Sequence, residues 1–374
     1  MSGHPDVLVV GGGVIGCACA FALAREGLSV TLLEADDVAS RASGAAAGML
    51  LPYGEAEAPG VFLSWAARSL ELFPELCAEL RERSGIDPEL ELCGALHLAR
   101  GDAEARRLRD KVQGFSDRGL ARMEWLDPGD ASALEPSLGP ELRGAAFSPG
   151  EGHVRSALLT QAFAAAAGEL GARIELGITV TGLRRSGTRV TGVETGSGVR
   201  QAGAVLLCAG AWSGPLAPFA LPLEPVRGQI LSLDGTRPTL RHMLVSDDVY
   251  LVPKRDGSVV VGATVERSGF DCRVTAAGMA ALLAAALRVA PALREARFRD
   301  GWAGLRPATP DALPAIGPAP GLAGLFVAAG HFRNGVLLAP VTGRLVAELL
   351  LGKALPEDAS AFDPGRFGAG ASRA

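Results

Sequence analysis

The chain opens with two short apolar runs that are separated by a glycine-rich turn and a helix-like segment. Residues 7–10 are all apolar, residues 17–26 have helical spacing, and residues 28–33 form a second apolar run. Short apolar runs bounded by glycine are typical of buried parallel strands. The pattern therefore predicts a strand, a helix and a second strand in one parallel β-α-β unit.

The turn after the first run has the spacing Gly-x-Gly-x-x-Gly. Gly11 permits a tight turn, Gly13 lets the backbone approach a pyrophosphate, and Gly16 lets the helix pack closely on the strand. The helix N-terminus offers free N–H groups to an anion. Glu34, at the end of the second run, can accept hydrogen bonds from a ribose diol. We predict dinucleotide binding; the alternative is a purely structural glycine turn.

The middle of the chain mixes helical and strand-like patterns. The pattern predicts packed or charged helices at 61–85, 103–109 and 154–170, a proline-containing connecting loop at 125–138, and strands at 172–183 and 203–208. The small residues 41–49 suggest either a flexible loop or a backbone that passes close to a flat ligand. The helix at 154–170 and the strands after it repeat the β-α-β order of the N-terminal unit, so we expect the chain to return to the first sheet near residue 150.

The last third of the chain first has the pattern of short strands and tight turns that is typical of an antiparallel sheet. It then returns to a strand followed by a helix. Runs at 229–233, 250–253 and 258–262, with Asp-Gly turns, predict an antiparallel sheet over the cofactor, and 275–289 predicts a helix. A strand at 325–329 ends in Gly330, and a helix follows from 336 or 340 to 351. This second strand–glycine–helix element would aim another helix N-terminus at the ligand.

The predicted fold class is α/β, and α+β in part, with a discontinuous Rossmann-like cofactor domain and a second domain built on an antiparallel sheet. We assign 1–88, 140–215 and 301–368 to the cofactor domain, 89–139 and 216–300 to the substrate domain, and 369–374 to a frayed tail.

Composition excludes several classes of protein. The 374 residues carry a formal charge of −5 with a pI near 5.7, which argues against nucleic acid as a partner. The longest uncharged run, 201–223, contains glycines and prolines, so we expect no membrane span. The first strand begins almost at once, so we expect no signal peptide. Six cysteines without a Cys-x-x-Cys pair suggest buried thiols in a reducing cytoplasm.

The pattern favours a flavin over a nicotinamide cofactor. No second Gly-x-Gly-x-x-Gly occurs, so the organic substrate itself would supply the hydride. A nicotinamide domain is expected to close within about 150–200 residues. The C-terminal helix N-terminus suits a flavin, because it would stabilise the anion formed on reduction.

Several motifs resemble the glycine oxidase branch of the D-amino acid oxidase family. They are the glycine turn, Arg41–Met49, Tyr250-Leu-Val-Pro, Val261-Gly-Ala-Thr, Trp302-Ala-Gly-Leu-Arg-Pro and the stretch from Gly330 to Pro340. The resemblance covers the chain except its tail. It implies FAD, held without a covalent bond, oxidation of amines or D-amino acids, and dioxygen as electron acceptor. It also implies a homo-oligomer and a role in making the thiazole half of thiamine.

The resemblance, with the glycine motifs, implies a set of cofactor residues in seven segments. They are Gly11, Gly13, Val14, Ile15 and Gly16; Glu34 and Ala35; Arg41, Ala42, Ser43, Ala46, Ala47, Gly48 and Met49; Val180; Ala209, Gly210 and Trp212; Gly304; and His331, Phe332, Arg333, Asn334, Gly335, Val336 and Leu337.

The resemblance also implies the residues that hold the substrate. Arg306 would clamp a carboxylate, because a planar guanidinium matches it bidentately. Tyr250 would lie above the substrate and Arg333 nearby. The alternatives are a surface arginine, a core tyrosine and an arginine that holds its own loop. We expect His331 to anchor its loop rather than act as a base, and we expect no metal site.

The predicted chemistry needs no side-chain base, because hydride transfer from a neutral amine requires mainly that the α-hydrogen point at the flavin. Val265 and Asp248 depart from the residues familiar in glycine oxidases, so the preferred amine stays open. Two other functions stay open: a flavin dehydrogenase that passes electrons to a quinone, and a non-catalytic FAD-binding partner protein.

Overall fold

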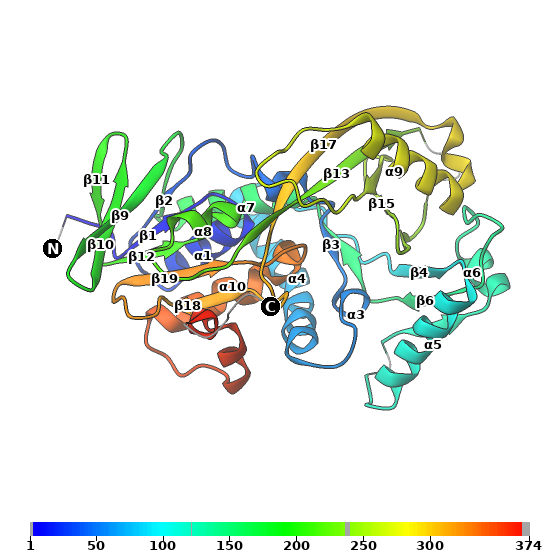
Figure 1. Cartoon of the computed structure of the whole chain (residues 1–374), viewed down its shortest axis with the longest axis horizontal. Helices are drawn as coiled ribbons and strands as arrows, with labels where there is room; N and C mark the ends of the chain where they lie inside the picture. The colour runs from blue at the N-terminus through cyan, green and yellow to red at the C-terminus, as the bar shows by residue number, and fades with distance from the viewer. Residues whose placement is uncertain (1–2, 121, 236–239, 369–374) are drawn as a thin grey trace.

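The computed structural model describes residues 3–120, 122–235 and 240–368. The whole predicted tail, 369–374, lies outside these residues, as do residues 1–2 of the first predicted segment. Figure 1 shows a parallel-sheet part at one end, an antiparallel part at the other, and long strands that run between them.

A six-stranded sheet contains the two N-terminal strands side by side. Its order is β18-β19-β12-β1-β2-β8, and every pairing is parallel except β18 with β19. The strands are β1 (Val7–Val10), β2 (Val30–Leu33), β8 (Arg173–Glu175), β12 (Ala204–Leu207), β18 (Ala315–Pro318) and β19 (Leu325–Ala329). The predicted β-α-β unit and the return of the chain to this sheet are therefore confirmed.

Four helices pack together beside this sheet: α1 (Val14–Arg25), α4 (Val61–Ser84), α7 (Ser156–Glu169) and α10 (Gly335–Leu350). The other face is covered by a three-stranded antiparallel sheet of β9 (Val180–Ser186), β10 (Arg189–Thr195) and β11 (Gly198–Gln201). Part of the predicted strand at 172–183 therefore belongs to this separate sheet. A loop at 176–179 divides it, and Gly177 there has a positive φ.

An eight-stranded sheet, ordered β17-β13-β16-β15-β14-β4-β6-β5, forms the second part. All pairings are antiparallel except β14 with β4. Its strands are β4 (Ala95–Ala99), β5 (Glu124–Leu126), β6 (Gly144–Ser148), β13 (Glu224–Asp234), β14 (Met243–Val245), β15 (Tyr250–Pro253), β16 (Val259–Gly262) and β17 (Arg297–Ala308). The predicted antiparallel sheet is confirmed, and β13 is longer than expected.

Three helices accompany this sheet: α5 (Asp102–Ser116), α6 (Pro128–Leu134) and α9 (Ala276–Val289). The loop expected at 125–138 is wrong, because α6 lies within it. Its two prolines bound the helix instead of interrupting it. Pro128 occupies the first turn, where its missing N–H costs nothing, and Pro136 follows the C-cap residue Glu135.

The strand pairings differ from the expected domain division at two places. β6 and residues 301–308 of β17 pair within the eight-stranded sheet, although the expected division places 140–215 and 301–368 in the cofactor domain. Figure 1 shows β13 and β17 reaching from the antiparallel part toward the parallel sheet. These long strands connect the two parts of the structure.

The remaining elements are short and lie mainly between the two large sheets or after α10. They are β3 (Met49–Leu50), which pairs with β7 (Gly152–His153); α2 (Ala42–Ala45), α3 (Pro52–Glu55) and α8 (Ser213–Leu216); and the 3₁₀ turns η1 (Gly210–Trp212), η2 (Pro291–Glu295), η3 (Glu357–Phe362) and η4 (Pro364–Phe367).

Candidate active site

One cavity of about 1020 Å³ runs from the glycine turn to the eight-stranded sheet. Its walls come from the ends of β1, β2 and β12, the segment 41–51, the strands β15 and β17, and the loop before α10. The carboxyl ends of parallel strands open into it, as is usual for ligand sites in open α/β sheets. The cavity therefore joins the predicted cofactor motif to the predicted substrate residues.

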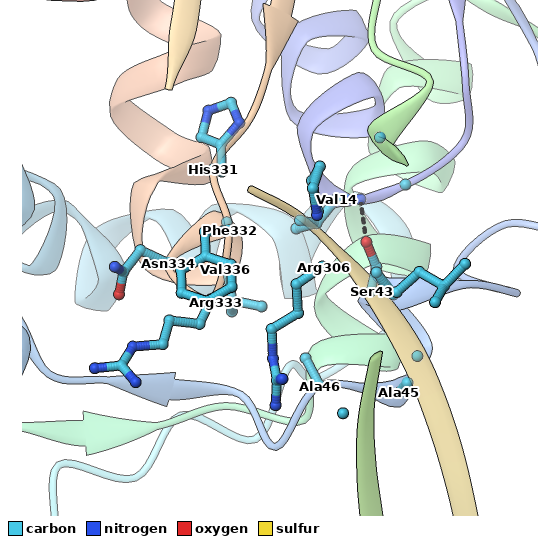
Figure 2. A pocket seen from close by; sticks show the side chains of 18 of the residues that line it. Val14, Ser43, Ala45, Ala46, Arg306, His331, Phe332, Arg333, Asn334 and Val336 are labelled. Atoms are coloured by element: carbon cyan, nitrogen blue, oxygen red, sulfur yellow. Dashed lines mark hydrogen bonds between the residues drawn. The ribbon is translucent and has the colours of Figure 1, made fainter. Parts of the chain in front are cut away.

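The cavity has a glycine cradle at its cofactor end. A Cβ on Gly16 would lie 1.9 Å from the Gly11 carbonyl oxygen, so only glycine lets α1 approach the turn this closely. The Val14 N–H donates to Ser43 Oγ over 2.9 Å, the contact drawn in Figure 2. The Ser43 hydroxyl therefore lies at the N-terminus of α1, where its O–H can be donated to a pyrophosphate.

Glu34 lies at the edge of this cradle, at the end of β2. Its two carboxylate oxygens accept hydrogen bonds from the Gly12 N–H over 2.6 Å and from the Asp36 N–H over 2.9 Å. The carboxylate is held on the cavity wall by the glycine turn itself. A ribose diol could bind to its remaining lone pairs.

The segment 42–49 gives the cavity a wall of small side chains. A Cβ on Gly304 of β17 would lie 2.7 Å from Ala45 Cβ, so the strand and the segment touch without a side chain between them. The Trp302 indole N–H donates to the Ala45 carbonyl over 2.9 Å. This close, flat arrangement fits the ring system of a flavin, and the cradle fits its pyrophosphate, so the residues present suit FAD.

Arg306 extends from β17 into the cavity, beside the loop that carries Phe332 and Arg333 (Figure 2). Its Nη1 donates to the Thr264 carbonyl over 3.1 Å. A Cβ on Gly228, across the β13–β17 pairing, would lie 2.3 Å from Nη2. The guanidinium therefore has one fixed backbone partner and keeps further N–H groups for a carboxylate.

Tyr250 lies over the backbone of β16, because a Cβ on Gly262 would come within 2.4 Å of its hydroxyl oxygen. Burial raises the pKa of this phenol, and the nearby Arg306 guanidinium opposes the rise. The phenol thus stays protonated at neutral pH and can act as a hydrogen-bond donor next to Arg306.

Arg333 forms an ion pair with Glu55 of α3, with Nε and Oε2 separated by 2.5 Å. Both residues line the cavity. The Arg333 side chain is half exposed, and Glu55 was not singled out in the sequence because no local pattern marks it. This pair connects α3 to the loop before α10 at the mouth of the cavity.

His331 is buried at the start of this loop. Its Nε2 lies 3.0 Å from Thr342 Oγ1 in α10, and burial lowers its pKa to about 3. A neutral imidazole bonded to the helix fits the loop anchor expected from the sequence. The Asp248 carboxylate is likewise bound by other side chains of the protein. It accepts hydrogen bonds from Ser246 Oγ over 2.8 Å and from Arg288 Nη2 over 2.6 Å.

The cavity gathers nearly every candidate residue. Gly11, Gly13, Val14, Ile15, Glu34, Ala35, Arg41, Ala42, Ser43, Ala46, Ala47, Gly48, Met49, Val180, Ala209, Gly210, Trp212, Tyr250, Gly304, Arg306, His331, Phe332, Arg333, Asn334, Gly335 and Val336 line it. Gly16 and Leu337 do not. Gly16 packs behind the turn, and Leu337 is buried among the helices.

The cysteines are less uniform than expected. Cys17, Cys19, Cys77 and Cys208 are buried, but Cys272 is exposed and Cys93 is only partly buried. The expectation of six buried thiols is thus wrong for these two. Cys208 alone lines the cavity among the cysteines, all of which are described, and burial raises its thiol pKa well above the usual range.

Two further observations concern the described residues as a whole. Within 3–120, 122–235 and 240–368, no helix is both long and apolar enough to cross a membrane. No group of three or more His, Cys, Asp or Glu side chains in these ranges is arranged to hold a metal ion.

The fold and the cradle define an FAD-binding oxidoreductase, and sequence comparison identifies the family. Residues 6–349 match the model of the family described as "FAD dependent oxidoreductase", so the chain belongs to this family. The family model spans both sheets and the cavity between them.

Individual relatives are also similar over nearly the whole chain. Glycine oxidase of Geobacillus kaustophilus is 38% identical over 368 residues, 97% of each chain. Its crystal structure has a TM-score of 0.93 at 37% identity, covering 97% of this chain and 99% of that chain. L-proline dehydrogenase from P. horikoshii has a TM-score of 0.87 at 26% identity, covering 97% and 98%.

A longer relative is the bifunctional protein ThiO/ThiG of Trichormus variabilis. It is 36% identical over 366 residues, 97% of this chain but 55% of that protein. The chain therefore spans about half the length of the bifunctional relatives that it matches.

Proposed function

We propose that this protein is an FAD-dependent oxidase of glycine and other small amines or D-amino acids. A hydride passes from the substrate α-carbon to the flavin, and dioxygen takes up the electrons to give an imine and hydrogen peroxide. The observation that carries the proposal is the position of Arg306. Its guanidinium faces the same cavity as the small-residue wall of 42–49 and, among the residues that the structure describes, donates to a single backbone carbonyl.

The roles of the side chains follow from their chemistry. Arg306 binds the substrate carboxylate, and Tyr250 donates a hydrogen bond beside it. FAD supplies the hydride acceptor when it is bound. The part left to the protein is to hold the α-carbon at near-attack distance from the flavin ring.

FAD is held without a covalent bond in this proposal. Gly13, Val14 and Ser43 bind the pyrophosphate, Glu34 binds a ribose, Val180 meets the adenine, and 46–49 with 331–336 enclose the ring. The high thiol pKa of Cys208 supports non-covalent binding, because a thiol is a weak nucleophile. Acid precipitation is expected to release all of the flavin into the supernatant.

The six-stranded sheet would carry FAD and the eight-stranded sheet the substrate, which retains the predicted two-part division as a proposal. A place in thiamine thiazole synthesis is supported by the name of the bifunctional relative. The homo-oligomeric state and the cytoplasmic location expected from the sequence stay predictions, which sedimentation and cell fractionation would test.

The experiment is an anaerobic reduction of the purified, FAD-loaded protein. Glycine, sarcosine and D-alanine are added separately, and the flavin absorbance is followed. Bleaching by glycine and release of hydrogen peroxide on admitting air are expected. A flavin that stays oxidised with every amine would overturn the proposal and favour a non-catalytic FAD-binding partner protein.

The same experiment separates an oxidase from a dehydrogenase. The similarity to an L-proline dehydrogenase structure favours the dehydrogenase as the second candidate. Bleaching without fast reoxidation by air, followed by fast reoxidation with a soluble quinone, would support that candidate. Peroxide release at the rate of turnover would exclude it.

A further inference from the structure

Lys254 is a buried lysine directly behind the wall of the cavity. Lys254 follows β15, and only 7% of its surface is exposed to solvent. It is one of only three lysines in a chain rich in arginine. Its Nζ donates to the Ala47 carbonyl over 2.6 Å and to the Val154 carbonyl over 3.1 Å. The ammonium thus binds the backbone of the segment that lines the cavity.

The Lys254 ammonium has no close counter-ion in the part of the chain that the structure describes. Among the salt bridges of the described ranges, none joins a carboxylate to its Nζ within 4.0 Å. The nearby Arg155 is itself paired with Glu89 and Asp256. His153 Nδ1 lies 3.4 Å away, and burial lowers the pKa of this imidazole to about 3, so it is neutral.

A buried ion without a partner of opposite charge is expensive. The penalty is several kcal/mol even after the protein relaxes, and two carbonyl contacts offset only part of it. Consistent with this, burial lowers the pKa of Lys254 to about 7, with Arg155 adding to the effect and Glu89, Cys93 and Asp256 opposing it. The buried ammonium therefore costs the fold stability, so a stabilising role does not explain why a lysine occupies position 254.

The peptide that Lys254 binds presents its other side to the cavity. In a trans peptide the N–H points opposite to the C=O, so the Gly48 N–H points away from Lys254. Gly48 lines the cavity, and no hydrogen bond of the described residues uses its N–H. The ammonium, the Ala47 carbonyl and the Gly48 N–H therefore form a polarised chain directed at the ligand.

We propose that Lys254 is a positioning residue for the FAD ring. It fixes the Ala47–Gly48 peptide so that the Gly48 N–H points toward the ring, and it places a positive charge on the far side of this peptide. The inference rests on the proposed function, which puts the flavin ring against 46–49. A fixed charge in a water-poor site favours the electron-rich, reduced ring over the oxidised ring. Lys254 therefore raises the tendency of bound FAD to accept a hydride.

The decisive variants are Lys254→Gln, which removes the charge but keeps a donor, and Lys254→Arg, which keeps the charge. We expect Lys254→Gln to weaken FAD binding about tenfold and to shift the midpoint potential of bound FAD to more negative values. Lys254→Arg is expected to stay near the wild type in potential. The matched control is Lys353→Gln, which removes a half-exposed lysine paired with Glu26.

Measurement at several pH values separates charge from packing. Raising the pH from 6 to 8 discharges Lys254, so the wild-type potential is expected to drift toward that of Lys254→Gln. Lys254→Arg is expected not to show this drift. Equal potentials in all three proteins at pH 6 would overturn the inference, and so would a parallel pH course of the wild type and Lys254→Arg.

None of these readouts requires an amine. A wild-type protein that binds FAD and shows the Lys254 effect but oxidises no amine would keep this inference and sink the proposed function. The reverse result, amine oxidation without a Lys254 effect, would sink only the inference. If Lys254→Gln fails to fold, as circular dichroism would show, the pH comparison of wild type and Lys254→Arg still decides.

Discussion

At the residue scale, the position of the Arg306 guanidinium depends on the absence of a side chain at the neighbouring position 228. Position 228 has no side chain, so the guanidinium can lie against the backbone of β13, and Thr264 offers a carbonyl to one of its nitrogens. Tyr250 uses the bare backbone of Gly262 in the same way. Two glycines in neighbouring strands therefore shape the substrate end of the cavity.

Replacing Arg306 by lysine should impair the use of carboxylate substrates. Lysine keeps the charge but loses the bidentate geometry, and it cannot reach the Thr264 carbonyl and a carboxylate together. We expect kcat/KM for glycine to fall roughly 30- to 150-fold, corresponding to about 2–3 kcal/mol. Steady-state peroxide assays measure this change. An unchanged kcat/KM would remove Arg306 from the site.

The Gly228→Ala variant tests the same geometry without changing a charged group. The new Cβ would collide with the guanidinium, whose position must change. We expect about a tenfold higher KM for glycine, with FAD affinity unaltered. Gly196→Ala is the control, because a Cβ there meets nothing within 4 Å. Equal KM values for the two variants would contradict the prediction.

At the element scale, α1 and α10 approach each other through small residues. A Cβ on Gly343 of α10 would lie 2.8 Å from the Ala18 carbonyl oxygen of α1. Both helices begin at the cavity, α1 after Gly13 and α10 after Asn334. Their close packing fixes the two N-termini relative to each other, so the contact matters for the cofactor site as well as for the core.

The Gly343→Ala variant should lower the free energy of unfolding by about 1–3 kcal/mol, because the neighbouring atoms are backbone and cannot move alone. Urea denaturation of the apoprotein measures this change. The matched control is Gly168→Ala in α7, where a Cβ meets nothing within 4 Å. That variant should be neutral or stabilising by up to about 1 kcal/mol. Similar values for both variants would argue against tight α1–α10 packing.

At the scale of the whole molecule, stability should depend on pH through two buried histidines. Burial lowers the pKa of both His153 and His331 to about 3 from 6.5. Below pH 6.5 the unfolded chain takes up protons on these imidazoles that the folded protein does not, so the contribution of the two histidines to stability is full above pH 6.5 and declines as the pH falls. Each histidine lowers the free energy of unfolding by about 2 kcal/mol between pH 6.5 and pH 5.

The His331→Gln variant checks this dependence. Its free energy of unfolding, measured by urea denaturation at pH 7, 6 and 5, should decline less steeply than that of the wild type. The difference should reach about 2 kcal/mol across this range. His4→Gln is the control, because His4 is exposed. Parallel pH profiles of His331→Gln and the wild type would show that His331 is not held neutral.

Local pattern was enough to predict the cofactor half of the protein. The glycine turn, the helix after it and Glu34 lie within 30 residues, so strand, turn and helix signals reinforce each other. The strand 325–329 and the helix after it were also correct, because a strong apolar run ends at a glycine. Where prolines bounded a short helix, as in α6, the same signals were misleading.

By itself the sequence determined the β-α-β unit, the antiparallel texture of the second part and, through resemblance, the candidate residues of the cavity. Only the tertiary structure decided how they meet. Lys254 binds a carbonyl 207 positions away, and Arg333 pairs with a residue 278 positions away. Such contacts depend on strand order and register across the whole sheet, which no local pattern of residues specifies.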